Sequence, residues 1–202
     1  MSEPRAEAPA FDEVVPGIVH WRIRDERIHG HVSAAHAILD GEGAVLVDPL
    51  PLAADALASL GPVAATVVTA GTHQRSSWRY RRELGPRVWM PAAARLIDEE
   101  PDERYADGDE LPGGLRAVFT PGAGTTQHTL LLGERVAFVP DLLSRQEGEE
   151  LALVPAEYMH DPPEARRSLQ RLLELSFETL CLSHGAPVTD DPHAAIRRAL
   201  SR

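Results

Sequence analysis

Short apolar segments that end at polar residues constrain the fold of this chain most strongly. Ala44 to Val47 is wholly apolar and ends at Asp48, and the segment from Phe177 to Leu182 ends at Ser183. Apolar runs of this length are typical of buried strands. Stretches with helical periodicity fall between and after these segments, and we expect helices at 52–60, 76–84, 92–99, 163–175 and 192–200. This alternation predicts an α/β or α+β fold built from layered sheets.

The domain organisation follows from the length and the composition. The chain has 202 residues, which fits one domain. Residues 1–10 are polar and rich in proline, glutamate and alanine, so we expect a disordered tail there. No linker or low-complexity segment divides the remainder. We therefore expect residues 11–202 to form a single domain.

The charge balance argues against several classes of partner. The formal net charge is -11, whereas proteins that bind nucleic acids or anionic membrane surfaces are usually basic. No run approaches the roughly 20 apolar residues that a membrane-spanning helix needs. The sequence therefore predicts a cytoplasmic protein that binds a small molecule, and it leaves a homo-oligomer open.

The residue types also limit the chemistry. All twenty basic residues are arginine, which excludes a lysine nucleophile. Cys181 is the single cysteine, so an intramolecular disulfide is impossible. It lies in the apolar run Thr179 to Leu182, and we interpret it as a buried structural thiol.

Six landmarks occur in an order that resembles the metallo-β-lactamase superfamily. They are Val45 to Pro49, Thr69 to Arg75, Asp107 to Leu115, Thr120-Pro121-Gly122, Val136 to Asp141, and Leu182-Ser183-His184-Gly185. The resemblance covers about 140 residues. It implies a four-layer αββα sandwich, with the site at the mouth between the two sheets.

The same resemblance implies that most metal ligands are missing. The family motif is Thr-His-x-His-x-Asp-His, and with Thr69 as its first residue the four ligand positions hold Ala70, Thr72, Gln74 and Arg75. Ala123 stands where a histidine normally follows Pro-Gly, which leaves only Asp141 and His184 at ligand positions. Catalytic zinc usually takes three protein ligands and a water. We therefore expect no tightly held cofactor, and zinc or another divalent metal only in a remodelled site.

Other residues are candidates for such a remodelled site. His73 lies on a spacer position of the motif, and a rearranged loop would aim it inward. The alternative is a loop histidine without a functional role. Asp48 is expected near the site by resemblance. Arg75 is expected at the mouth of the pocket, where its guanidinium would pair with Asp141 and replace the charge of a metal.

The remaining histidines favour structural interpretations. His29, His31 and His36 match nothing in the family's ligand set, and we expect a solvent-facing hairpin there. His128 precedes an apolar run, which also favours a structural role.

Two main functional hypotheses remain open. The first is a protein with a degenerate metal site that binds a small ligand, for example an anion, or a partner protein. Its pocket would contain Asp48, Thr72, Gln74, Arg75 and Ala123. The second is a divergent hydrolase of small esters or thioesters, with His73, Asp141 and His184 as catalytic candidates and with or without one metal. A third interpretation is a regulatory or oligomerisation module with an unused pocket.

Overall fold

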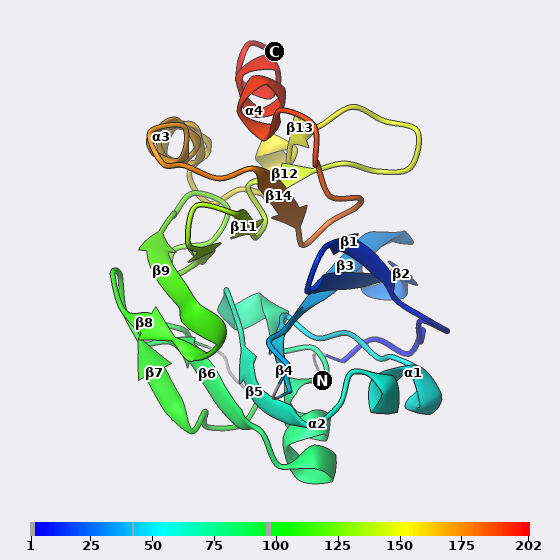
Figure 1. Ribbon diagram of the computed structural model, residues 1–202. Helices are drawn as coiled ribbons and strands as arrows, with labels where there is room; N and C mark the ends of the chain where they lie inside the picture. Colours follow the sequence, from blue (N-terminus) through cyan, green and yellow to red (C-terminus); the bar gives the residue numbers. More distant parts are fainter. Residues whose placement is uncertain (1–2, 42, 96–97) are drawn as a thin grey trace.

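Two sheets face each other and helices cover their outer faces, so the chain forms a four-layer αββα sandwich (Figure 1). The structure is a computed structural model that describes residues 3–41, 43–95 and 98–202. The helices are α1 (Ala54–Ser59) and α2 (Ser77–Leu84) on the first sheet, and α3 (Pro162–Leu172) and α4 (Pro192–Leu200) on the second. The predicted fold class and layer order are confirmed.

The first sheet has its seven strands in chain order. They are β1 (Asp12–Val15), β2 (Ile18–Asp25), β3 (His31–Leu39), β4 (Ala44–Val47), β5 (Val63–Val67), β6 (Arg87–Pro91) and β7 (Glu103–Tyr105). The strands from β4 to β7 run parallel to their neighbours, whereas β1 to β4 pair in antiparallel fashion. Parallel neighbours need a crossover connection, and α1 and α2 supply two of these connections.

The second sheet has five strands. Their order is β14 (Thr179–Leu182), β11 (Val136–Val139), β10 (His128–Leu132), β9 (Leu115–Phe119) and β8 (Glu110–Leu111). Only β11 and β14 are parallel within it. A small sheet of β12 (Leu143–Ser144) and β13 (Ala152–Leu153) lies beside it. The described residues also form four 3-10 turns: η1 (Glu26–Ile28), η2 (Gly71–His73), η3 (Pro112–Gly114) and η4 (Ala156–Tyr158).

Apolar layers fill both the space between the sheets and the space under the helices. Val45 and Val67 of the first sheet pack against Leu115, Phe138 and Cys181 of the second. The other face of each sheet packs against its helices. Strands that are buried on both faces need apolar residues at every position, which explains the unbroken run from Ala44 to Val47. Burial also raises the pKa of the Cys181 thiol, as a structural role requires.

Two local expectations differ from the structure. The described part of the expected tail lies against the domain, with Ala8 buried and hydrogen-bonded to the backbone of Pro51 and Ala53. The expected helix at 92–99 is a turn at its start, and residues 96–97 lie outside the described part.

Among the described residues, no helix is long and apolar enough to cross a membrane.

The expected histidine hairpin is only partly exposed to solvent. His29 and His31 are exposed, but His36 is buried in β3 and stacks on His20 of β2 with ring centroids 6.2 Å apart. Phe138 of the second sheet contacts the same ring edge-on. Alternation along the strand turns His36 into the space between the sheets, and the sequence interpretation missed this.

A buried arginine links strands of both sheets. Arg75 follows η2 and is 2% exposed. Its guanidinium donates to the backbone oxygens of Ala34 at 2.7 Å, Asp48 at 3.0 Å and Ser183 at 3.4 Å. These oxygens come from β3, from the end of β4 and from the end of β14. The side chain therefore fixes the two sheets relative to each other at this edge.

We predict that Arg75→Met destabilises the fold strongly. The substitution leaves three backbone oxygens without the guanidinium donor and removes one of the two cationic groups near Asp48, the other being His73. We therefore expect a loss of roughly 3–5 kcal/mol in the free energy of unfolding. Urea denaturation would measure it. Arg82→Met, at an exposed arginine of α2, should change stability by less than about 0.5 kcal/mol. Equal effects of the two substitutions would contradict this role.

We also predict acid destabilisation through His36. Burial, together with the neighbouring His20, lowers the pKa of His36 to about 3. The unfolded chain therefore takes up a proton near pH 6.5 that the folded chain does not, and stability falls as the pH decreases from there. In urea denaturation at pH 7 and pH 5, His36→Leu should reduce the difference in stability by about 2 kcal/mol. If the difference in stability between pH 7 and pH 5 is the same in His36→Leu as in the wild-type protein, other groups cause the loss of stability in acid.

Candidate functional site

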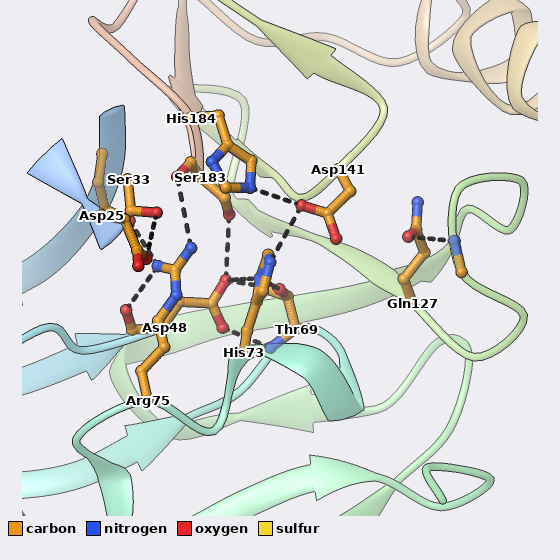
Figure 2. Close-up of polar contacts among 12 residues, drawn as sticks. Asp25, Ser33, Asp48, Thr69, His73, Arg75, Gln127, Asp141, Ser183 and His184 are labelled. Carbon is orange, nitrogen blue, oxygen red and sulfur yellow. Dashed lines mark hydrogen bonds and ion pairs between the residues drawn. The ribbon is translucent and has the colours of Figure 1, made fainter. Parts of the chain in front are cut away.

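Polar residues follow four buried strands at one edge of the sandwich. Asp48 follows β4, Thr69 lies just beyond β5, Asp141 lies just beyond β11, and Ser183 and His184 follow β14. β4 is parallel to β5 and β11 is parallel to β14, so the carboxyl ends within each pair lie together. Figure 2 shows that these side chains, together with His73, form one cluster at this edge.

The Asp48 carboxylate holds the centre of this cluster. One oxygen accepts a hydrogen bond from the Thr69 backbone N–H at 2.7 Å. The other oxygen accepts from the hydroxyls of Thr69 at 2.6 Å and Ser183 at 3.1 Å, and it lies 2.8 Å from His73 Nδ1. Burial alone would raise the pKa of Asp48, but His73 and Arg75 outweigh burial and lower it. The carboxylate is therefore ionised and fully hydrogen-bonded.

His73 points into the cluster because of the turn that carries it. It is the last residue of η2, it is 4% exposed, and Ala70 before the turn is extended. Its Nδ1 faces Asp48, and its Nε2 lies 3.0 Å from Asp141 Oδ1. Burial favours the neutral ring, but the carboxylates of Asp141 and Asp48 outweigh burial and raise the pKa of His73 to about 9. The inward orientation that the sequence left open is the one observed.

His184 meets the same carboxylate oxygen from the other side. Its Nε2 lies 2.8 Å from Asp141 Oδ1, and its Nδ1 lies 3.2 Å from the backbone oxygen of Val32. Burial alone would raise the pKa of Asp141, but the two histidines hold it well below its usual range. Asp141 and His184 are partly exposed, with side-chain exposures of 25% and 16%. This side of the cluster is open to solvent.

The donor set fits a single divalent cation. His73, His184 and Asp141 each offer one ligand atom, and these atoms all lie within 4.8 Å of one another. The Nε2 atoms of both histidines are the ones that face Asp141. Histidines that bind metals almost always donate the N–H of the other ring nitrogen to a carboxylate or a backbone carbonyl. Here Asp48 and the Val32 oxygen face the two Nδ1 atoms. Two histidines, one carboxylate and an open side are also the pattern of catalytic zinc sites.

Arg75 does not take the place that the sequence interpretation gave it. We expected its guanidinium at the mouth of the pocket, paired with Asp141. The structure instead buries it among three backbone oxygens, and the two histidines contact Asp141. Arg75 has a left-handed backbone with φ at 43°. The guanidinium is thus unavailable to an anionic ligand.

The other expected pocket residues are peripheral to the cluster. Thr72 is exposed. The Gln74 side chain donates to the Gly71 backbone and accepts from Trp78 Nε1, so it supports the turn. Ala123 is partly buried and packs against the apolar layer under α3.

Sequence reasoning missed two residues of the cluster. The roles of the Thr69 and Ser183 hydroxyls on Asp48 were not foreseen, although both residues follow buried strands that end at the same edge. That position was the signal that could have identified them. His128 was expected to be structural, and its ring packs against Tyr105 and Phe119.

Comparison with known proteins agrees with this architecture. A metallo-β-lactamase from Erythrobacter litoralis is 16% identical, with a TM-score of 0.65, and the match covers 95% of this chain and 90% of that one. A metallo-β-lactamase family protein from Thermus thermophilus is 17% identical, with a TM-score of 0.69 and coverages of 94% and 78%. An archaeal superfamily protein from Sulfolobus tokodaii is 13% identical, with a TM-score of 0.67 and coverages of 96% and 83%.

These likenesses establish the fold alone, because the identities are low and one fold supports many functions. No curated protein matches the chain. The family profile described as the metallo-β-lactamase superfamily matches residues 15–200. This match spans almost the entire sandwich and both halves of the cluster. The chain therefore belongs to the metallo-β-lactamase superfamily.

Proposed function

We propose that this chain is a remodelled hydrolase that holds one divalent metal ion, with zinc as the first choice, through His73, Asp141 and His184. The observation that carries the proposal is the convergence of the two Nε2 atoms on Asp141 Oδ1, while acceptors hold both Nδ1 atoms. His73 occupies a spacer position of the family motif, so the site uses a ligand that the motif does not contain. This geometry supports the second hypothesis of the sequence analysis, a remodelled site with one metal, over a chain without a bound metal.

The residues of the chain have distinct parts in this proposal. Asp48 would keep the proton of His73 on Nδ1 and leave Nε2 free to bind the metal. The Val32 oxygen would do the same for His184. A bound metal would polarise a carbonyl oxygen and make water a stronger nucleophile at neutral pH. The exposed side of Asp141 and His184 is where a small ester or thioester would approach.

A second function has its own support. Without a metal, Asp141 accepts hydrogen bonds from both histidines, and the raised pKa of His73 keeps that ring protonated between two carboxylates. Such a cluster satisfies its own charges and leaves no histidine nitrogen free to act as a general base. A metal-free protein of this kind would bind a small ligand or a partner rather than catalyse hydrolysis. The acidic charge and the buried single cysteine fit a cytoplasmic location in either case.

We predict that protein purified without a histidine tag binds about one zinc ion per chain. His73→Asn should lower zinc affinity by at least about 100-fold, because it removes one of three ligands. His160→Asn, at an exposed histidine outside the cluster, is the matched control and should leave affinity unchanged. Elemental analysis measures the zinc content of the wild-type protein and of both variants, and the visible absorption of the cobalt-substituted proteins reports on the metal ligands. Wild-type protein that binds neither zinc nor cobalt would favour the metal-free function.

We also predict weak hydrolysis of 4-nitrophenyl acetate by the zinc-loaded protein. Asp141→Asn and His73→Asn should reduce kcat/KM by at least about 100-fold, since each removes a metal ligand. His160→Asn should retain the rate. Hydrolysis that survives removal of the metal, or that is equal in all four proteins, would rule out this site as its source.

A further inference from the structure

The loop at 120–127 forms the side of the cluster opposite the two histidines. It connects β9 to β10, and the residue after it, His128, donates its backbone N–H to the Thr69 oxygen at 2.9 Å. Thr69 in turn contacts Asp48 and His73. Figure 2 shows the Gln127 side chain on the loop side of Asp141, with His73 and His184 on the other side. A molecule held at Asp141 would therefore face this loop.

Gln127 has an unused hydrogen-bond donor at this place. Its side chain is 1% exposed, and its Oε1 accepts from the Gly124 N–H at 2.8 Å. This bond fixes which end of the amide is oxygen and which is nitrogen. Among the described residues, Nε2 is buried and has no hydrogen-bond partner. A buried N–H group without an acceptor is costly, and such groups in native proteins call for an explanation.

Exposed apolar side chains flank the same loop. Phe119, at the end of β9 where the loop begins, is 40% exposed, and Tyr158 is 65% exposed. The backbone just after Tyr158 is joined to the loop by hydrogen bonds from His160 to Ala123 and from Asp161 to Gly122. Large apolar side chains are otherwise mostly buried in this chain. Phe119 and the segment that follows Tyr158 adjoin the loop that carries Gln127, so both residues offer exposed apolar surface near this loop.

We propose that Gln127 is the substrate-recognition donor of the site, with Nε2 donating to the carbonyl oxygen of an ester or thioester that carries an apolar acyl group, and to a carboxylate oxygen of the acid product. Phe119 and Tyr158 contact that acyl group. The inference rests on the proposed hydrolase function and names its substrate class. It explains why a buried amide is kept with one end bonded and the other end free.

Two substitutions separate recognition from folding. Gln127→Glu keeps the acceptor for Gly124 and replaces the Nε2 donor with an oxygen, whereas Gln127→Met removes both polar ends. With zinc-loaded protein and 4-nitrophenyl butyrate, both variants should lose at least about tenfold in kcat/KM while zinc content stays at the wild-type value. Gln170→Glu, the same charge change on the exposed face of α3, is the control and should retain the rate.

A binding measurement tests the contact without turnover. The side-chain amide of Gln127 gives its own pair of NMR signals, identified by their loss in Gln127→Glu, and titration with butyrate should shift them. Wild-type kcat/KM in both variants, or Gln127 signals that stay fixed throughout the titration, would overturn the proposal. If the wild-type protein neither binds zinc nor hydrolyses the ester, the proposed hydrolase function is contradicted. The butyrate titration of the same protein would still decide whether Gln127 contacts the ligand.

Discussion

The rest of this edge of the sandwich depends on the ionised carboxylate of Asp48. It is 1% exposed, and a buried charge is tolerated only where hydrogen bonds and opposite charges compensate for lost hydration. Thr69, His73 and Ser183 supply the hydrogen bonds, and Arg75 lies close by. These residues come from different strands and turns. The need to satisfy one carboxylate therefore fixes the relative positions of β4, β5, η2 and β14.

Arg75 extends this constraint to the backbone. Arginine offers several donors in a rigid plane, and here the plane reaches one oxygen within β3 and two oxygens just beyond the ends of β4 and β14. A lysine would reach fewer acceptors with its single ammonium group. Because the guanidinium is buried and donates to three backbone oxygens, its charge serves the fold and compensates Asp48. In the proposed function, ligand binding therefore falls to the partly exposed side chains of Asp141 and His184.

The buried strands and the layered fold class could be predicted because the relevant signals are local, whereas the order of the four layers came from the resemblance to the superfamily. Apolar runs such as Ala44 to Val47 report burial on both faces of a strand, and the polar residues after them mark the edge where the strands end. The partners of Arg75 could not be predicted from the sequence. All three are backbone oxygens, which every residue has, so the side chains at these positions do not indicate the contact. His36 was missed for a related reason. Its burial depends on strand register, and a shift of one residue would have turned it to the other face.

The position of His73 shows why ligand motifs transfer poorly between distant relatives. A motif records which residues face a site when the loop has one particular conformation. Residues in a 3-10 turn point about 120° apart, so a change from an extended loop to a turn brings a different residue inward. In this chain Ala70 is extended, η2 follows, and the spacer residue His73 faces Asp141, while Thr72 faces solvent. A nitrogen donor is thus present at the site although the motif positions hold none. For chains of this kind, the loop conformation decides whether a missing motif means a missing site.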